Sequence, residues 1–456
     1  MKKDYRPKQI DLQKITLTNF QGQSLPLDSL LYSFSLYEDL FTNTMSVELK
    51  IIDAVALLED FPITGEELLE IQFETPTTEN NIRALFDVYK ISERQKIEER
   101  TDAYTLYGVT REFISSTNRR IKKAYNKLRI DQIVRNVYNE SLKSNNSIKD
   151  IFVEDTLGLH SYIAPKTNAL DFINFLASEA QSKKYPHQSS FIFYEDHDQW
   201  NFRTITQLID TPTVEDLYWA EFDVNEKGVQ KQQDTPDESQ RIIEIDFLNQ
   251  FDFIKQADGG LFSNNLKVID PILKKAEDFS FVYDKDFEKK MPITMGGNKV
   301  ITPITSHAES DGEGHSRYFT GKLSQGQYSQ TSYLKDRITE ENDVFLFHPS
   351  LRQKFINSTT ASFASLNNIG FELMIAGNSL FKPGQMINLY IPSNSMDEDN
   401  KTTYNKYFGD KDNAKFLVVR VEHTYNKASN EYFTKMKVVK DSYAEPIEST
   451  FDLDGN

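Results

Sequence analysis

Strict alternation of apolar and polar residues is the feature that most limits what this chain can fold into. It is clearest in residues 416–441, FLVVRVEHTYNKASNEYFTKMKVVKD, where two alternating runs flank a polar break at Ala428-Ser429-Asn430. Successive side chains of a strand point to opposite faces, so a period of two indicates a strand with one buried face. The segment therefore predicts a long β-hairpin with its turn at the polar break.

The same succession of predicted strands occurs twice. Each copy has a strand, a turn with Pro and Gly, a second strand, a polar loop and a final two-stranded ribbon. The first copy comprises 46–51, 62–65, 69–73, 84–91 and 104–109, and the second comprises 371–375, 383–384, 387–391, 416–421 and 432–439. Two unrelated β-meanders could agree in this way by coincidence, but the shared order and loop character favour two related β domains.

Helical periodicity replaces alternation in the middle of the chain. Apolar residues at 130, 133, 134, 137 and 138 form the stripe of an amphipathic helix. A second helix is predicted from Leu170 to Ala180, with Thr167 or Asn168 as its N-cap. The apolar pieces at 191–194 and 200–202 flank a polar turn and predict a hairpin, so the middle of the chain is α+β.

These patterns predict a β-rich α+β fold class, with two antiparallel β-barrel or sandwich domains and an inserted α+β middle domain. The expected division is 11–112 (first β domain), 113–240 (middle domain), 241–270 plus 350–440 (second, split β domain), 271–349 (insertion) and 441–456 (C-terminal tail). Polar composition predicts a linker at 223–240 and irregular loops at 306–330 and 394–414, and Ser350 is expected to cap a helix that runs to Leu366.

Composition excludes several classes of function. The chain has no cysteine, so disulfides, thiolate metal sites and cysteine nucleophiles are excluded. Its net charge is −17, from 52 basic and 69 acidic residues, which argues against tight binding of nucleic acid. No apolar run is long enough to span a bilayer, and the first residues give no expectation of a secretory signal.

Histidine, of which there are seven, offers two candidate sites. His197 lies in the segment 195–198, Glu-Asp-His-Asp, which could bind a metal ion but is also typical of a solvated turn between two strands. We expect the turn, because metal ligands usually come from several parts of a chain.

Glu422-His423 places a carboxylate beside an imidazole within the long hairpin. Adjacent strand residues point to opposite faces, so the two side chains are not expected to converge on one substrate. If Leu417, Val419 and Val421 share a face, His423 continues their row. We therefore predict that this pair is structural.

Other motifs are weaker. Gly321-Lys322 resembles the end of a phosphate-binding loop, but Ser316 stands where its first glycine would be and Leu323 cannot hold magnesium. No Gly-x-Ser-x-Gly elbow is present, and the many acidic residues single out no pair for glycoside hydrolysis. We predict no catalytic, cofactor-binding or metal-binding residues, no cofactor, and no enzyme activity.

Several segments together resemble a known family. They are LYEDLFTNTMSVELKIIDA with PITGEELLEIQF, then LDFINFLASEA with FIFYEDHDQWNF, and finally FKPGQMINLYIP with FLVVRVEHTYNK and YFTKMKVVK. The chain, from about residue 11 to 440, resembles the baseplate hub protein of T-even-type contractile-tailed phages. It is also similar to the N-terminal part of type VI secretion spike proteins.

The resemblance implies a homotrimer with two tube-type β domains in each chain, which form a pseudo-six-fold ring. Such a ring adapts a hexameric tail tube to a trimeric central spike, contacts other baseplate subunits and lets DNA pass without specific binding. The implied location is the virion tail baseplate, assembled in the host cytoplasm. The expected ring-building elements are Ser46 to Ile51, Ala84 to Ile91, Phe371 to Ile375 and Phe416 to Val439.

Two alternatives remain open from sequence. One is a virion-associated hydrolase of peptidoglycan or glycan, which would need a cleft with a carboxylate of raised pKa. The other is the hub of a non-phage contractile injection system, which sequence does not separate from a phage hub.

Overall fold

The fold is known from a computed structural model. It describes residues 8–76, 80–144, 147–185, 189–219, 239–250, 252–270, 275–286, 293, 317–322, 359–366, 368–396, 402–409 and 413–444. The predicted linker at 223–240 and insertion at 271–349 lie mostly outside the described residues, as do Ser350 and most of the C-terminal tail.

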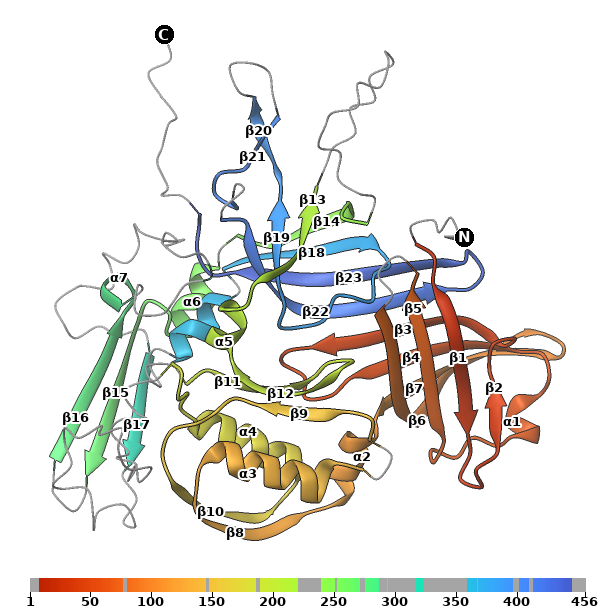
Figure 1. Cartoon of the computed structure of the whole chain (residues 1–456), viewed down its shortest axis with the longest axis horizontal. Helices are drawn as coiled ribbons and strands as arrows, with labels where there is room; N and C mark the ends of the chain where they lie inside the picture. Colours follow the sequence, from red (N-terminus) through yellow and green to blue (C-terminus); the bar gives the residue numbers. More distant parts are fainter. Residues whose placement is uncertain are drawn as a thin grey trace.

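A 13-stranded sheet dominates the described structure and gives the chain its β-rich character, as predicted (Figure 1). The strands of its N-terminal part are β1 (Asp11–Thr18), β2 (Ser24–Pro26), β3 (Leu31–Asp39), β4 (Ser46–Asp53), β5 (Leu68–Thr75), β6 (Asn80–Glu98) and β7 (Thr101–Thr110). The strands of its C-terminal part are β13 (Thr213–Tyr218), β14 (Ile242–Asn249), β18 (Ile369–Ala376), β19 (Met386–Tyr390), β22 (Lys415–Asn426) and β23 (Glu431–Lys440).

The two parts pair their strands in the same order. The first, which we call β region 1, runs β3-β4-β7-β6-β5-β1, and the second, β region 2, runs β14-β18-β23-β22-β19-β13. Each encloses a hydrophobic core of its own. The predicted correspondence of β4, β5, β6 and β7 with β18, β19, β22 and β23 is thus confirmed, and β3 corresponds to β14.

The register of the paired strands also argues against a coincidental likeness of the two β regions. The pairing of β6 with β7 slips between Val88 and Lys90, and that of β22 with β23 slips between Val418 and Arg420, the matching place in the order. In the strand next to each ribbon, buried Leu49 in β4 corresponds to buried Leu373 in β18. The shared strand order, the shared slip and the matched burial indicate a repeated structural unit. The two copies differ in that β1 pairs antiparallel with β5 whereas β13 pairs parallel with β19, and in that β6 and β7 have further slips beyond Ser92.

The turn before β5 and β19 is also built alike. The backbone N–H of Thr64 donates to Glu67 Oε1 at 2.8 Å, and that of Lys382 donates to Gln385 Oε1 at 3.0 Å. A side-chain oxygen that accepts from the backbone of its own turn replaces a missing ladder bond. The predicted Pro/Gly turns therefore share their chemistry as well as their place.

The middle region packs two helices against small sheets around a third core. Its elements are α2 (Arg111–Asn118), β8 (Ile121–Leu128), α3 (Ile130–Val137), a π-helical turn (Tyr138–Leu142), β9 (Asp150–Val153), β10 (His160–Thr167), α4 (Ala169–Glu179), β11 (Phe191–Glu195), β12 (Gln199–Thr204) and α5 (Ile205–Ile209). The predicted stripe of α3 is fully buried, and Asn168 caps α4 by accepting from the Asp171 N–H, as predicted. In Figure 1, β9, β11 and β12 lie between α3 and α4 on one side and the large sheet on the other.

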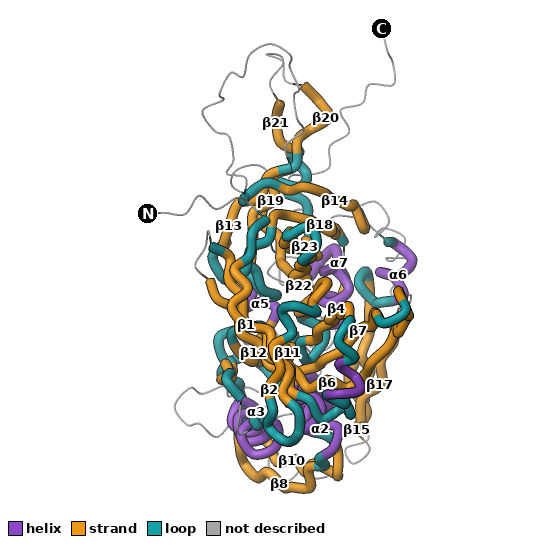
Figure 2. Tube along the Cα trace, turned by 90° about the vertical axis from the view of Figure 1, so that its right-hand side faces the viewer, coloured by secondary structure: helices purple, strands orange, loops and turns teal. Residues whose placement is uncertain are grey.

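Remaining short elements correct two predictions. Within 306–330, Arg317–Lys322 is a strand, β17, which pairs with β15 (Ser263–Asp270) beside β16 (Lys275–Val282). Within 394–414, β20 (Pro392–Met396) pairs with β21 (Thr402–Tyr404) and projects from the sheet (Figure 2). Both predictions of irregular loop were wrong there, because short polar strands carry no alternating hydrophobic signal.

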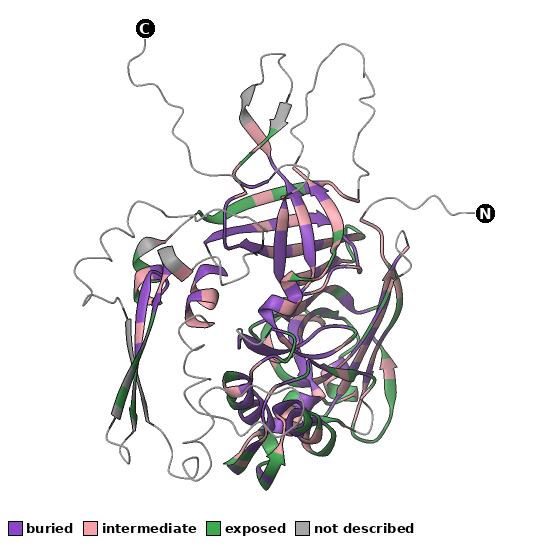
Figure 3. Ribbon diagram, turned by 60° about the vertical axis from the view of Figure 1, so that its left-hand side comes forward, coloured by how far each residue is buried: buried purple, intermediate pink, exposed green. Residues whose placement is uncertain are grey.

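Three short helices complete the set: α1 (Leu57–Asp60), α6 (Phe253–Asp258) and α7 (Tyr283–Asp286). Among the described residues, none of the helices is long and apolar enough to cross a membrane. Buried residues line the interior of each β region and of the middle region (Figure 3), and a smaller fourth core that includes Leu40, Tyr194 and Val419 lies where these parts meet.

Candidate functional site

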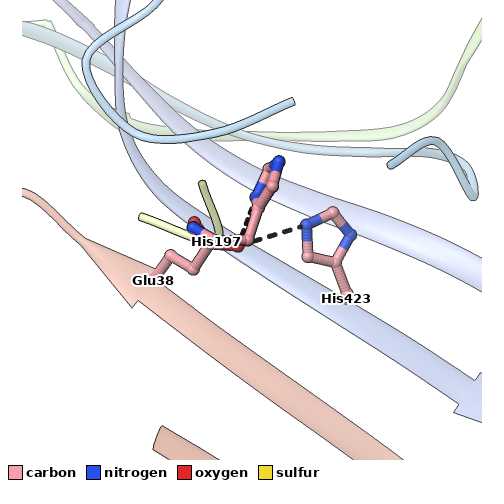
Figure 4. A group of neighbouring side chains, drawn as sticks. All are labelled: Glu38, His197 and His423. Atoms are coloured by element: carbon pink, nitrogen blue, oxygen red, sulfur yellow. Dashed lines mark hydrogen bonds and ion pairs between the residues drawn. The ribbon is translucent and has the colours of Figure 1, made fainter. Parts of the chain in front are cut away.

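The turn between β11 and β12 enters the place where β regions 1 and 2 join. There Glu38 of β3, His197 of the turn and His423 of β22 converge, and we call these three residues the junction cluster (Figure 4). His197 Nδ1 lies 2.9 Å from Glu38 Oε1, and the His197 N–H donates to Glu38 Oε2 at 3.0 Å. His423 Nε2 lies 3.6 Å from the same Oε1. All three parts of the chain therefore meet at one carboxylate.

The structure corrects the prediction of a solvated turn at 195–198. The hairpin is present, but Glu195 is 1% exposed, Asp196 is 2% exposed and His197 is 9% exposed. The turn is polar because it supplies partners to buried groups of the two β regions. Sequence shows a polar turn in either case, since burial by distant strands leaves no local pattern.

The prediction for Glu422-His423 is confirmed in its main point. Glu422 accepts a hydrogen bond from Thr424 Oγ1 at 3.0 Å, whereas His423 is fully buried, with its Nδ1 2.7 Å from the Tyr432 hydroxyl. The two side chains have separate partners on opposite faces, so they form no joint acid–base pair.

The expected single row of Leu417, Val419 and Val421 is wrong. Leu417 and Val419 belong to the core shared with the middle region, whereas Val421 joins the core of β region 2. The register slip between Val418 and Arg420 explains this, because one extra residue exchanges the faces of a strand.

Burial and mutual charge set the protonation of the junction cluster. Burial alone would raise the pKa of Glu38, but the charge and hydrogen bond of His197, with help from His423, hold it well below its usual range. For His197, burial lowers the pKa and the Glu38 carboxylate more than offsets this, so its pKa is raised. For His423, burial prevails and its pKa is lowered. The surroundings thus favour the ionised form of Glu38 and the protonated form of His197, and disfavour the protonated form of His423.

The chemistry available to this cluster is limited by its burial. Two imidazole nitrogens and a carboxylate oxygen within 4.8 Å of one another form a set that a zinc-like ion accepts. However, Glu38 and His423 are fully buried, and the Glu38–His197 contact is already satisfied as an ion pair. The arrangement fits a structural joint rather than a reaction centre, and the predicted absence of catalytic and metal-binding residues stays a prediction.

A second buried charge fastens the other side of the same turn. Lys149 Nζ lies 2.7 Å from Glu195 Oε1 and donates to the Asp196 carbonyl at 2.7 Å. Glu195 Oε2 accepts from the Met45 N–H at 3.0 Å and from Thr110 Oγ1 at 2.6 Å. This group joins the middle region to β region 1. Sequence analysis missed Lys149, which stands in a polar segment without any motif.

The two β regions join laterally, through pairing of β3 with β22. The antiparallel register runs from Asp39 opposite Arg420 to Ser33 opposite Asn426, and Ser35 Oγ and Thr424 Oγ1 lie 3.1 Å apart. Pairing of two sheet edges satisfies their backbone groups and removes both edges. We call this contact the lateral junction.

A groove of about 460 Å³ offers no acid–base chemistry. It lies between β region 1, the middle region and the helical residues near 359–363, and its lining includes Phe41, Asn43, Asn174, Phe193 and Phe363. None of its lining residues is titratable. Only amide, hydroxyl and apolar contacts are available there.

Comparison with known proteins gives matches in structure but none in sequence. No family model and no curated protein matches the sequence. The structure is similar to a tail protein from Neisseria meningitidis MC58 (TM-score 0.53, 9% identity, 94% of this chain and 96% of that chain). It is also similar to the 43 kDa tail protein of prophage MuSo2 from Shewanella oneidensis (TM-score 0.51, 9% identity, 94% and 99%).

A weaker match is a type VI secretion component of E. coli (TM-score 0.42, 9% identity, 96% of this chain and 79% of that chain). At these identities the two tail proteins show the fold alone. The chain shares its β-rich α+β fold with these two tail proteins over nearly its whole length, which confirms the predicted fold class.

Proposed function

We propose that this protein is a structural baseplate hub of a contractile tail. Three copies would form a ring with pseudo-six-fold symmetry that connects a hexameric tail tube to a trimeric central spike. The observation that carries the proposal is the repeated order of six strands, present twice in one chain and joined side by side through β3 and β22.

Symmetry explains why such a chain suits this role. Subunits in closed rings use identical surfaces, so a trimer of single-unit chains presents three-fold faces only. A chain with two equivalent units presents six similar surfaces as a trimer. The likeness to tail proteins supports the setting in a tail, and the two β regions supply the means.

The partners and location follow from this proposal. The chain would contact itself, a tail tube protein, a central spike protein and other baseplate subunits, after assembly in the host cytoplasm. The ring would form part of the DNA conduit in the virion tail, or the passage of a non-phage injection system. The protein would act without catalysis.

The acidic composition has a place in the same proposal. Three chains carry three times −17, or −51, and part of this charge would line the passage so that DNA slides without sticking. An electrostatic map of the assembled ring tests this idea, and a neutral or basic lumen would refute it.

Native mass and negative-stain images of the purified protein test the proposal. We expect trimers and a three-fold ring with six lobes, and a monomer at every concentration would contradict the ring. A zymogram on bacterial cell walls tests the absence of catalysis, since clear lysis would favour a hydrolase.

A further inference from the structure

β3 and β22, which pair in the lateral junction, have equivalents in the other β region, namely β14 and β6. These two equivalents do not pair with each other within one chain. We propose that β14 of one copy pairs antiparallel with the distal half of β6, residues 89–98, of a second copy. The partner is thus another copy of this chain, and the inference rests on the proposed ring for the number of copies.

β14 is the counterpart of β3. β3 pairs with β4 and slips register between Leu31 and Ser33, while β14 pairs with β18 and slips between Ile242 and Glu244. Because β4 corresponds to β18, the two slips fall at the same place in the repeated unit. β14 therefore presents its outer edge as β3 does.

The two strands differ in what covers that edge. In β3, whose outer edge pairs with β22, Phe34 is 1% exposed and Leu36 is 0% exposed, and both belong to the core of β region 1. In β14, Phe247 is 58% exposed and Leu248 is 40% exposed. Tyr218 of β13 bridges to Arg241, directly before β14, but no described strand pairs with the outer edge of β14 itself. An edge strand with exposed large apolar side chains is a ready site for pairing with another chain.

The distal half of β6 is the counterpart of the covered part of β22. β5 pairs with β6 only over Asn80–Asp87, and beyond that point β7 is the only described strand that pairs with β6. On β22, the equivalent stretch Arg420–Asn426 is covered by β3. On β6, Tyr89 is 52% exposed and Ile97 is 56% exposed.

Charge also suits the pairing. β14 carries Glu244 and Asp246 and no basic residue, whereas residues 89–98 carry Lys90, Arg94 and Lys96 beside two acidic residues. Opposite charges on facing strands favour the correct partner and speed its approach. Repulsion between like charges also disfavours pairing of β14 with β14 of another copy, or of β6 with β6 of another copy.

The contact between copies would be weaker than the lateral junction. Within one chain, Tyr425 and Tyr432 at the end of the β22–β23 ribbon are buried in the core of β region 1. The end of the β6–β7 ribbon is polar, so backbone pairing, charge and the apolar face of β14 carry the contact between copies. Since exposed charges are screened by salt, we expect the assembly to dissociate more readily at high ionic strength.

The repeat fixes the expected register. In the lateral junction Glu422 stands opposite Tyr37, and the repeated order places Ser92 at the position of Glu422 and Leu248 near that of Tyr37. β14 has an additional slip between Phe247 and Asn249, so the register is expected to within about one residue.

Disulfide trapping tests the proposal, since the natural chain has no cysteine. Ser92→Cys is combined in turn with Phe247→Cys, Leu248→Cys or Asn249→Cys, the variants are oxidised, and masses are read on non-reducing gels. We expect at least one pair to give covalent dimers and closed trimers. Ser35→Cys with Thr424→Cys is the matched positive control, which should close within one chain. Ser92→Cys with Ile163→Cys, a residue 72% exposed in the middle region, should give no trimer.

A dissociation measurement complements the trapping. Phe247→Asp should raise the concentration at which half of the assembly dissociates by roughly tenfold or more, because it removes the central apolar contact and adds repulsive charge beside Asp246. Phe20→Asp, at a residue 60% exposed in the turn between β1 and β2, is the matched control and should leave dissociation unchanged. Circular dichroism checks that both variants stay folded.

The outcomes separate this inference from the proposed function. Native mass of the wild type reports on the trimer, and a trimer that forms without any trapped pair would overturn the β14–β6 contact while leaving the hub in place. Trapped pairs in a dimer or an open chain would support the contact and contradict the trimeric hub. Absence of trapping by all three register variants overturns the inference, whatever the mass.

Discussion

The turn at 195–198 is fastened on its two sides by buried charges of different kinds. On one side Lys149 holds Glu195 and ties the middle region to β region 1. On the other side His197 meets Glu38 and His423, where both β regions join. Burial raises the pKa of Glu195, although the charge of Lys149 and the hydrogen bonds to the carboxylate oppose this rise. On the other side the groups with shifted pKa values include His197 and His423. One turn is therefore held by a buried lysine–carboxylate pair on one side and by a histidine cluster on the other.

Neither group should be regarded simply as a source of stability. Removing two charges from water costs several kcal/mol for each ion, and the attraction between them repays this only with good geometry and further hydrogen bonds. Both groups have such bonds, and both connect parts of the chain that are far apart in sequence. These two groups disfavour other placements of the turn, because a misplaced turn would leave Glu38 or Glu195 buried and unpaired.

The largest effect is expected from Lys149→Met, which leaves Glu195 buried without its cation. Loss of one partner of a buried pair costs about 3–5 kcal/mol, and we expect this loss in the local opening of the β11–β12 hairpin. Hydrogen exchange of the hairpin measures it. The double variant Lys149→Met/Glu195→Gln is the control and should recover most of the loss; no recovery would contradict a role for the charge pair.

Glu38→Gln should have the next largest effect. It removes the charge that His197 faces but keeps a polar side chain of similar size, so we expect a cost of about 2 kcal/mol. The pKa of His197 should fall, because Glu38 is the carboxylate that most opposes the effect of burial, and the weaker influence of Asp198 and Asp196 remains. Calorimetry and an NMR titration of the His197 ring give both values. An unchanged pKa of His197 would show that Glu38 is not its main partner.

The two histidines should respond to pH in opposite directions. The folded-state pKa of His197 is raised, so its contribution is complete below about pH 6.5 and is lost as pH rises through the folded-state pKa. The folded-state pKa of His423 is lowered, so its contribution is present above about pH 6.5 and is lost as pH falls.

Melting temperatures measured from about pH 5 to about pH 9, a range that includes the usual histidine pKa, separate these two effects. The difference in melting temperature between wild type and His197→Gln should become smaller as pH rises. The difference in melting temperature between wild type and His423→Gln should become smaller as pH falls. Parallel curves for both histidine variants would contradict the assignment of charge within the junction cluster.

The smallest effect is expected from an exposed ion pair in the same middle region. Lys123 Nζ lies 2.7 Å from Glu140 Oε2, with both side chains about half exposed. Such pairs contribute about 0–1 kcal/mol, so Lys123→Ala should change the melting temperature little. A loss as large as that of Lys149→Met would mean that burial does not distinguish the two pairs.

Alternation and periodicity predicted much of the fold because they are local. Each of these local features depends on residues that are close together in sequence. Examples are the strands around Leu49 and Leu373, the apolar stripe of α3 and the N-cap at Asn168. The repeat was visible for the same reason, since each copy carries its own local pattern. Strand β17 and the β20–β21 hairpin were missed because their residues show no alternation of apolar and polar side chains, and the polar residues around them indicate a loop.

The junction cluster could not be predicted, although two of its three residues drew attention. His197 and Glu38 are separated by 159 positions, and only the folded chain brings them together. His423 was placed on the correct face relative to Glu422, but the slip before Arg420 altered the row behind it. A slip depends on how two strands pair, so neither strand alone reveals it.

The sequence by itself determined where strands and helices form, that a β unit is repeated, and that adjacent residues such as Glu422 and His423 separate. These features follow from the geometry of a short stretch of backbone. Only the tertiary structure decided which strand edges meet, which edges of β14 and β6 pair with no other described strand, and which charges are buried together. Such features depend on contacts between segments hundreds of residues apart, whose free energies are not encoded in any local pattern.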